Sequence, residues 1–294
     1  MLPSSVKPAY WLETDATKRR SSYPFLSGDT FRDFADHIFD ETRKAFDSND
    51  IKYGDIIFVN GDYIHYFLMY VHPEIPVGYI LITHNTLFAP PGKYKNYLEG
   101  EKIIAWFAKN IQIKNHPKLH GIPLGLANRY WPHGNIEVLY SVINKEIRKD
   151  KLLYLNILSN THDSRLGIIE MFKDKPYCFV ANKKPFDGYM QDIARSKFVL
   201  SPRGAGLDCH RTWEAILVGS IPIVPQSVIT GLYEKLPILV IDDWSILTED
   251  YLNRKWDEMH QVDYDYDRMF AQYWFGKIKM CQSEARESYK KGLK

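Results

Sequence analysis

The fold of this chain is decided by residues 196–224, which read SKFVLSPRGAGLDCHRTWEAILVGSIPIV. Phe198–Ser201 is a short apolar run that predicts a buried strand, and the glycine-bearing segment Pro202–Gly206 predicts a loop. A helix is expected from about Asp208 to Val218, followed by a second strand over Ile221–Val224. The lengths of these segments, and the glycines and proline that separate them, indicate a strand–helix–strand unit. The two strands are therefore expected to run parallel in one sheet.

The polar residues of this unit lie where such units bind ligands. The loop that leaves the carboxyl end of a parallel strand faces the ligand crevice, and the helix N-terminus offers unpaired N–H groups to an anion. Gly204 and Gly206, on either side of Ala205, would let the backbone approach a phosphate closely. Arg203 and Arg211 add positive charge, and the planar guanidinium suits phosphate oxygens. The pattern predicts a pocket for a nucleoside diphosphate.

The expected helix also carries a polar patch. His210, Arg211 and Glu214 would lie within about 100° of one another on an ideal helix. The Glu214 carboxylate could accept hydrogen bonds from ribose hydroxyls, as acidic residues do in other dinucleotide-binding folds. An alternative is that Arg211 and Glu214 form a solvent-exposed pair at i,i+3 spacing. The spacing alone leaves both interpretations open.

The same stretch resembles the signature of the exostosin-like glycosyltransferases, family GT47 and its relatives. In that family a Ser-x-Phe-x-Leu-x-Pro-x-Gly segment is followed by Arg-x-x-Glu-Ala and then by Gly-Cys-Ile-Pro-Val. Here Ser220 replaces the usual cysteine and Ile223 the usual valine, both mild departures. The matching positions are Ser196, Phe198, Leu200, Pro202, Gly204, Arg211, Glu214, Ala215, Gly219, Ile221, Pro222 and Val224.

The resemblance implies an α/β fold of two Rossmann-like domains that face a central cleft, the GT-B architecture. The predicted strands and helices alternate through much of the chain, which also favours parallel sheets covered on both faces. We expect an N-terminal, acceptor-side domain over residues 1–145 and a nucleotide-sugar-binding domain over residues 146–262. A C-terminal helical segment over residues 263–294 is expected to pack back on the first domain.

The composition is that of an ordinary soluble globular protein. Apolar residues make up 45% and charged residues 25% of the 294 positions. The formal net charge of +2 gives no argument for binding to nucleic acid or to a membrane, and we expect no nucleic-acid partner. The aromatic content of 14% suits stacking on sugar rings, although aromatic side chains also fill cores. The three cysteines show no zinc-binding pattern.

The sequence shows no targeting or membrane segment. The first residues lack the apolar core of a signal peptide, and no run approaches the roughly 20 apolar residues of a membrane span. We therefore expect a cytoplasmic protein without a membrane span.

Sugar transfer needs a base that activates the acceptor hydroxyl, at least in an inverting reaction. The candidates are Asp62 and His65, which follow the predicted strand Asp55–Asn60, and His84, which closes the next predicted strand. Each also has an ordinary structural interpretation. Asp62 could cap a helix, His65 could belong to a helix face, and His84 could be a loop histidine with satisfied hydrogen bonds.

Two other polar segments have competing interpretations. Ser159, Asn160 and Arg165 follow the first predicted strand of the second half and could contact a diphosphate, or they could form an ordinary turn before a helix. Val262–Asp267 contains an Asp-x-Asp, the metal motif of the GT-A architecture. Because it follows a polar helical stretch instead of an apolar strand, we interpret it as a solvated acidic turn.

These patterns together predict a metal-independent glycosyltransferase that moves a sugar from a nucleoside-diphosphate sugar, with uridine as the expected base, to a glycan hydroxyl. The expected partners are the nucleotide sugar and a glycan or glycoconjugate acceptor, with no resident cofactor. Two alternatives stay open: a nucleotide-sugar epimerase or hydrolase, and a non-catalytic glycan- or nucleotide-binding protein of the same fold. The residues expected to bind the nucleotide sugar are Arg165, Arg203, Gly204, Ala205, Gly206, His210, Arg211 and Glu214.

Overall fold

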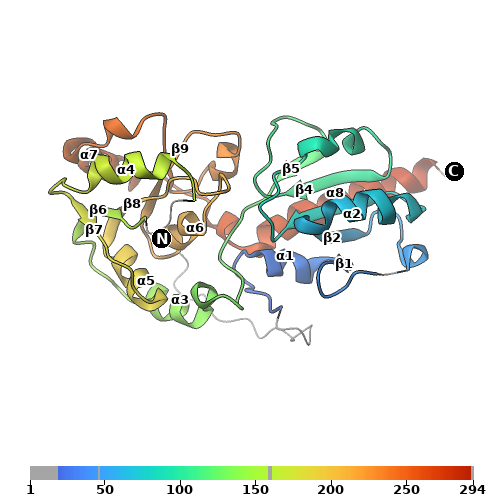
Figure 1. Ribbon diagram of the computed structural model, residues 1–294, viewed down its shortest axis with the longest axis horizontal. Coiled ribbons are helices and arrows are strands. Elements are labelled where there is room, and N and C mark those ends of the chain that lie inside the picture. Colours follow the sequence, from blue (N-terminus) through green and yellow to red (C-terminus); the bar gives the residue numbers. More distant parts are fainter. Residues whose placement is uncertain (1–18, 46, 158–160, 293–294) are drawn as a thin grey trace. The chain divides into compact units, whose positions relative to one another are not determined.

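The computed structural model describes residues 19–45, 47–157 and 161–292 (Figure 1). Residue contacts divide the described chain into two compact units. The first unit contains residues 19–124 together with 270–292, and the second contains residues 125–269. Each unit is built on its own five-stranded parallel sheet, so the predicted pair of Rossmann-like α/β folds is confirmed. The cleft that the resemblance implies between them stays a prediction.

The sheet of the first unit has its strands in the same order in space as along the chain. All neighbouring pairs are parallel, and the register is continuous apart from one irregularity between Tyr79 and Ile80. The sequence predicts strands over residues 55–60 and 78–83, and both are confirmed. It leaves the segment Ile103–Phe107 open between a strand and a short helix, and the structure shows a strand there. The strands are β1 (His37–Phe39), β2 (Ile56–Asn60), β3 (Tyr79–His84), β4 (Ile103–Ala108) and β5 (Leu119–Gly121).

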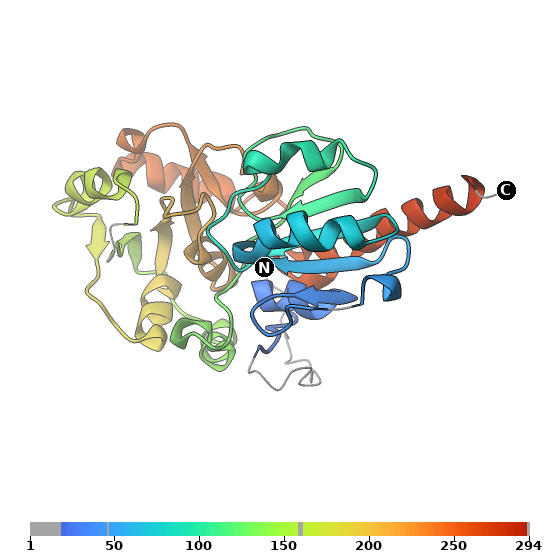
Figure 2. The same ribbon diagram turned by 45° about the vertical axis from the view of Figure 1, so that its right-hand side comes forward.

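This strand order determines which segments cover the sheet. Successive right-handed crossovers that always step in the same direction place every connection on one face. That face is covered by α2 (Ile64–Tyr66) and the turns that continue it to Glu74. Figures 1 and 2 show α1 (Gly28–Phe34) and α8 (Ala271–Gly292) on the other face, where they contact β3 and β4. The first sheet is therefore completed by a helix that comes much later in the chain.

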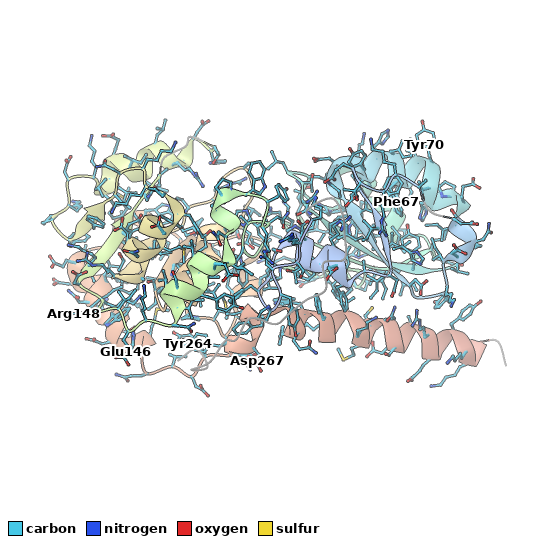
Figure 3. All side chains as sticks on the ribbon, turned by 90° about the horizontal axis from the view of Figure 1, so that it is seen from below. Phe67, Tyr70, Glu146, Arg148, Tyr264 and Asp267 are labelled. Carbon is cyan, nitrogen blue, oxygen red and sulfur yellow. The ribbon has the colours of Figure 1, made fainter. Side chains whose placement is uncertain are left out.

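The helix α8 is attached to the first unit along most of its length. The Gln282 side-chain amide donates to the Gly54 carbonyl oxygen at 2.7 Å, and the Arg286 guanidinium donates to the Asp55 carboxylate at 2.7 Å. Near its start, the Phe275 ring stacks on Phe34 with centroids 3.9 Å apart. Side chains project from α8 along its whole length in Figure 3. These contacts make α8 part of the first fold.

The turns that follow α2 have one buried face and one exposed face. Phe67 is fully buried, whereas Tyr70 is 63% exposed. In Figure 3, Phe67 points into the unit and Tyr70 points outward. The aromatic residues of this segment therefore serve both the core and the surface.

One predicted element of the first unit is wrong. The near-helical spacing of apolar residues from Phe31 to Phe46 predicts an amphipathic helix over residues 29–47, but α1 ends at Phe34 and the chain enters β1 at His37. The Asp36 carboxylate accepts a hydrogen bond from the Ile56 N–H at 2.9 Å, and Phe39 is 1% exposed. Pairing with β2 and burial of Phe39 outweigh the weak local preference for a helix.

The sheet of the second unit has a different order, β10-β9-β8-β6-β7, again with all pairs parallel. The chain therefore goes outward from β6 to β7, returns past β6 to β8, and continues to β9 and β10. The direction of winding reverses between β6 and β8. The strands are β6 (Lys151–Leu155), β7 (Cys178–Val180), β8 (Ser196–Leu200), β9 (Ile221–Pro225) and β10 (Leu239–Ile241).

Helices and apolar side chains hold this sheet in place. Phe198, Leu200 and Ile223 are fully buried on neighbouring strands, and burying one such side chain stabilises a fold by about 1.5–3 kcal/mol. The sequence also predicts a helix over residues 186–194, and α5 has these bounds. The helices are α3 (Ile136–Ile143), α4 (Ser164–Phe172), α5 (Phe186–Ala194), α6 (His210–Leu217) and α7 (Glu249–Met259).

The helix α3 precedes residue 145, so it falls in the range that the sequence predicts for the first domain. In the structure α3 contacts α5, and the contacts group residues 125–145 with the second unit. The unit boundary therefore falls near Gly125, at the end of the segment that follows β5. Among the described residues, none of the helices is both long enough and apolar enough to cross a bilayer.

Candidate functional site

The strand order of the second sheet points to one place for a ligand. Where the winding direction reverses, the loops after two adjacent strands separate and leave a crevice at the carboxyl edge of the sheet. Here those strands are β6 and β8, in which Lys151 pairs with Ser196 and Tyr154 pairs with Val199. The loop after β6 leads to α4, and the loop after β8 leads to α6. The loops that the sequence singled out therefore lie on both sides of the reversal.

The loop after β8 is fixed by hydrogen bonds at both of its ends. At its start, the Ser201 and Thr212 hydroxyls bond to each other at 2.8 Å, which ties the end of β8 to the first turn of α6. At its end, the buried Asp208 carboxylate accepts bonds from the Cys209 N–H at 2.9 Å and from the Tyr233 hydroxyl at 3.2 Å. The Trp213 indole N–H also donates to it, at 2.9 and 3.0 Å. Asp208 is the residue that positions the amino end of α6.

Replacing Asp208 with alanine is expected to lower the free energy of unfolding by about 2–3 kcal/mol, because three buried donors lose their acceptor. Tyr233→Phe removes a single one of these bonds and should cost about 1 kcal/mol. Urea unfolding of both variants measures the difference. Equal stability of the two variants would show that the carboxylate does not anchor the helix.

The predicted phosphate ligand Arg165 lies against the backbone of this loop. Its Nε donates to the Arg203 carbonyl oxygen at 2.9 Å. A Cβ atom added at Gly204 would lie 2.9 Å from the Arg165 Nη2 atom and 3.0 Å from the Thr161 hydroxyl oxygen. The missing side chain at Gly204 thus makes room for a guanidinium of the protein itself. Ser159 and Asn160 lie outside the described residues.

The rest of the loop folds back on itself. The Arg203 guanidinium is directed toward the carbonyl oxygens of Gly204 and Ala205, at 3.4 and 3.5 Å, and the Gly204 N–H donates to the Gly206 carbonyl oxygen at 3.1 Å. Ala205 is exposed at the tip of this turn. In this state Arg165 and Arg203 stabilise the loop, and a ligand would meet its exposed tip and the start of α6.

Arg211 and Glu214 form a buried polar cluster with Tyr189, from α5. The Tyr189 hydroxyl donates to Glu214 Oε2 at 2.7 Å, and it also lies within hydrogen-bonding reach of Arg211. Arg211 Nη1 donates to the Leu200 carbonyl oxygen, at the end of β8, at 3.3 Å. Glu214 is 4% exposed, so the alternative of a solvent-exposed pair is excluded. The cluster brings an arginine and a carboxylate to the edge of the sheet where the winding reverses.

The Arg211 guanidinium can donate a further hydrogen bond to a ligand. Its Nε is buried and has no hydrogen-bond partner among the described residues. Because a buried unpaired donor is costly, such a group is expected where a ligand supplies the acceptor.

Burial raises the pKa of Glu214 to about 7, against the opposing effects of the Tyr189 hydrogen bond and the Arg211 charge. In the unfolded chain this carboxyl ionises near its ordinary pKa of 4.5, so between pH 4.5 and 7 the folded state binds a proton that the unfolded state has lost. The contribution of Glu214 to stability is therefore full below pH 4.5 and is lost as the pH rises through 7.

Glu214→Gln should remove this dependence. Relative to the wild type, the variant is expected to gain up to about 3 kcal/mol of stability between pH 5 and pH 8. Urea unfolding at the two pH values checks the result, and the difference between the two proteins isolates Glu214 from other titrating groups. A constant difference in stability at both pH values would contradict the raised pKa.

His210 and Cys209, at the start of α6, have protein partners. His210 Nδ1 lies 2.8 Å from the Gly125 carbonyl oxygen, which can only accept, so Nδ1 carries the proton. The Cys209 thiol donates to the Pro202 carbonyl oxygen at 3.3 Å, and burial raises its pKa. A protonated, hydrogen-bonded thiol is a poor nucleophile, which agrees with a passive role for Cys209.

The three candidate bases all lie near the carboxyl edge of the first sheet, in different environments. His84 is buried: its Nδ1 accepts the Asn85 N–H at 2.8 Å, so its Nε2 is the nitrogen that donates to the Pro123 carbonyl oxygen at 3.2 Å. Both ring nitrogens are thus occupied, and His84 is poorly suited to accept a proton. Asp62 and His65 are exposed. Asp62 accepts a hydrogen bond from the Thr86 hydroxyl at 2.5 Å.

The sequence suggests only that Asp29 or Thr30 caps a helix, so the position of Asp29 within the first unit was not predicted. This carboxyl is 1% exposed and accepts hydrogen bonds from Arg19 at 2.8 Å and from the Asn85 side chain at 3.0 Å. Burial raises its pKa to about 6. A buried carboxyl at this edge of the sheet holds the loop after β3 in place. Asp29 and Asn85 lie far apart in the sequence, so only the structure shows that Asp29 holds this loop.

Among the residues that the structure describes, no three His, Cys, Asp or Glu side chains gather into a group that could hold a metal ion.

Comparison with known structures finds distant similarity. A structure described as "Crystal structure of GtfA/B complex" aligns with a TM-score of 0.36 and 11% identity, over 83% of this chain and 58% of that one. A structure of the pneumococcal O-GlcNAc transferase GtfA in complex with UDP and GlcNAc aligns with a TM-score of 0.37 and 13% identity, over 84% of this chain and 57% of that one. The chain thus spans less than two thirds of either structure.

Comparison of the sequence gives a more specific result. No curated protein sequence matches the chain. A family model described as the RXYLT1 C-terminal domain matches residues 139–284. This range includes the stretch 196–224, with Arg203 and Arg211, and also Arg165. Residues 139–284, just under half of the chain, are therefore similar to the RXYLT1 C-terminal domain.

Proposed function

We propose that this glycosyltransferase moves a sugar from a uridine-diphosphate sugar to a glycan hydroxyl, without a metal ion. The observation that carries the proposal is the cluster of Arg211, Glu214 and Tyr189 at the reversal of the second sheet. It combines an arginine that can donate hydrogen bonds to a diphosphate with a carboxylate that can accept them from a ribose. The name of the matched family makes UDP-xylose the first donor to test.

In this proposal the parts of the site have separate tasks. The N–H groups at the start of α6 and the Arg211 guanidinium bind the diphosphate and stabilise the negative charge that develops on it as the sugar leaves. Glu214 accepts hydrogen bonds from the ribose hydroxyls. Arg165 and Arg203 hold the loop over residues 202–206 in the shape that presents those N–H groups.

The acceptor hydroxyl loses a proton during transfer, and we assign its removal to Asp62. Of the three candidates, His84 has both nitrogens occupied, whereas the Asp62 carboxylate is exposed and oriented by Thr86. His65 is the second choice because it is exposed and, among the described residues, its one contact of note is with the Tyr94 ring, at 6.1 Å between centroids.

A thermal-shift measurement with UDP, GDP, CMP and ADP, with and without Mn²⁺, tests the nucleotide site. UDP should raise the melting temperature by mass action, since a ligand at a hundred times its Kd stabilises a fold by about 2.7 kcal/mol. We expect the shift to be independent of Mn²⁺ and to be lost in Arg211→Ala. A shift that requires Mn²⁺ would overturn metal independence, and no shift with any nucleotide would overturn the site.

Product analysis then separates the proposed reaction from its alternatives. Incubation with UDP-xylose and a panel of glycan acceptors should give a lengthened glycan and UDP. Release of free sugar or of an epimer without transfer would instead indicate a hydrolase or an epimerase. Nucleotide binding without any turnover would indicate a binding protein of the same fold.

A further inference from the structure

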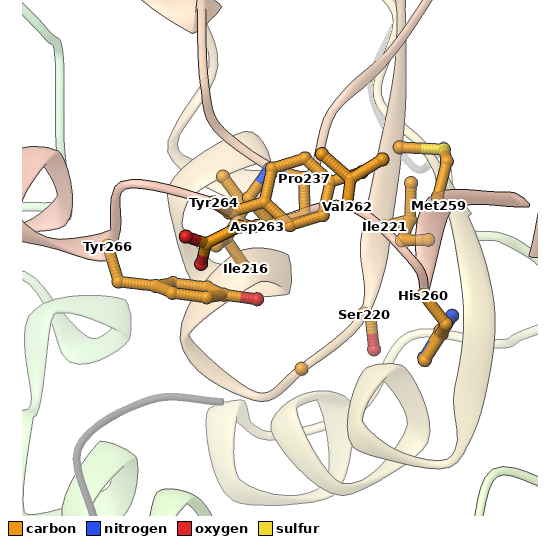
Figure 4. Close-up of a pocket in the computed structure, with 11 residues that line it drawn as sticks. Ile216, Ser220, Ile221, Pro237, Met259, His260, Val262, Asp263, Tyr264 and Tyr266 are labelled. Atoms are coloured by element: carbon orange, nitrogen blue, oxygen red, sulfur yellow. The ribbon is translucent and has the colours of Figure 1, made fainter.

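The second unit contains a pocket of about 560 Å³ at the opposite edge of its sheet (Figure 4). One wall is formed by Ile216 at the end of α6 and by Ser220 and Ile221, where β9 begins. The other wall is formed by residues 259–266, after α7. Because the strands are parallel, their amino ends lie away from the carboxyl edge that carries Arg211 and Glu214. The volume falls within the range of small-molecule sites, roughly 300–1,000 Å³.

Two tyrosines supply aromatic surface to this pocket. Tyr264 and Tyr266 are half-buried, with ring centroids 6.2 Å apart and planes at 73°. Neither hydroxyl forms a hydrogen bond with a described residue. Figure 4 shows the two rings on the same side of the pocket, with Asp263 between them. The segment that reads as a solvated acidic turn therefore directs its aromatic residues inward.

The polar groups of the pocket can accept hydrogen bonds from a ligand. Asp263 is exposed and makes no hydrogen bond within the described part of the chain. His260 Nδ1 lies 2.7 Å from the Trp256 carbonyl oxygen, so it carries the proton and Nε2 is left as an acceptor. These are groups to which hydroxyl-bearing ligands donate.

The charge of the pocket excludes phosphates. None of the described residues that line it is lysine or arginine. Lys149 does not line the pocket, and its amine donates to the Val218 carbonyl oxygen at 2.9 Å and to the Ser220 hydroxyl at 2.7 Å. The Ser220 hydroxyl in turn lies 2.6 Å from the Ile193 carbonyl oxygen and 2.8 Å from the Ser196 carbonyl oxygen, between which it shares its single proton. A nucleotide would meet a carboxylate here and no cation from the described lining.

We propose that this pocket binds neutral sugar rings of a glycan, as a second carbohydrate site separate from the transfer site. The apolar face of a sugar packs on the rings of Tyr264 and Tyr266, and its hydroxyls donate to Asp263 and His260. The idea that the glycan is the acceptor's own chain rests on the proposed function. In that case the pocket tethers a long acceptor and raises its effective concentration at the transfer site.

Saturation-transfer NMR on the whole chain tests the site with xylotriose, cellotriose and maltotriose as probes. We expect at least one trisaccharide to bind and its Kd to rise at least about tenfold in Tyr266→Ala, a change worth about 1.4 kcal/mol. Tyr266→Phe keeps the ring and should keep most of the affinity. Tyr70→Ala, which removes a 63% exposed tyrosine from the other unit, should change nothing.

Two further arms distinguish a sugar site from a nucleotide site and from a cation site. UDP should not displace the trisaccharide, and its thermal shift should be unaltered in Tyr266→Ala, which also shows that the variant folds. The proposal is overturned if no trisaccharide binds, if binding survives Tyr266→Ala, or if UDP competes. Binding of choline in place of sugars would also overturn it, because two tyrosines and a carboxylate would then form a cation site. The UDP shift itself reports on the transfer site alone, so the two proposals fail independently.

Discussion

Arg211→Ala is expected to lower kcat/KM for sugar transfer by about 10²–10³, the usual cost of removing one donor that stabilises developing charge. The guanidinium is held by the Leu200 carbonyl oxygen, and its buried Nε has no hydrogen-bond partner among the described residues. A diphosphate bound at the start of α6 would use this donor. Steady-state kinetics with UDP-xylose and the best acceptor measure the loss.

The controls for Arg211 separate charge from geometry. Arg211→Lys keeps the positive charge but loses the planar fork, so it should recover only part of the rate. Loss of the arginine leaves Glu214 buried beside Tyr189, but its pKa of about 7 allows it to take up a proton instead of remaining an unpaired charge. The variant should therefore fold. Unchanged turnover in Arg211→Ala would remove the proposed mechanism.

Asp62→Asn is expected to lower kcat by about 10²–10⁴, the range that a positioned general base contributes, with little change in KM. The substitution keeps the shape of the side chain, and asparagine can still accept the Thr86 hydroxyl bond that orients it. Because Asp62 is exposed, stability should be almost unchanged. Single-turnover measurements at saturating donor and acceptor isolate this chemical step.

His65→Gln is the matched comparison for Asp62. If the assignment is right, this variant keeps most of the wild-type rate. A large loss in His65→Gln with a normal rate in Asp62→Asn would transfer the role of base to the histidine. Normal rates in both variants would indicate a reaction in which no side chain from this edge removes the proton.

The second unit was the more predictable half because its signals are local. The strand–helix–strand unit over residues 196–224 and the helix over residues 186–194 carry their own punctuation, and the structure has them within a few residues of the predicted bounds. Once β8 and α6 are placed, the position of Arg211 and Glu214 follows from helical geometry. Burial of the pair could not be read from the spacing, since it depends on Tyr189 of α5.

What the sequence could not supply are contacts between distant segments. The helix predicted from residue 29 is cut short by pairing with β2, and no local signal marks that pairing. That Arg165 fills the space beside Gly204 is visible only in the structure, and its contact with a diphosphate stays a prediction. Asp208 was recognised only as the start of a helix, because its partner Tyr233 lies beyond the next strand.

The covering of the first sheet by α8 has a consequence for biosynthesis. The ribosome delivers β1 to β5 early, but the helix that shields one face of them emerges only after the whole second unit has been made. Proteins usually mature from the N-terminal end as they are synthesised. Here the second unit, which is continuous in sequence, can close first, while the nascent first sheet keeps apolar surface open to chaperones until its last helix arrives.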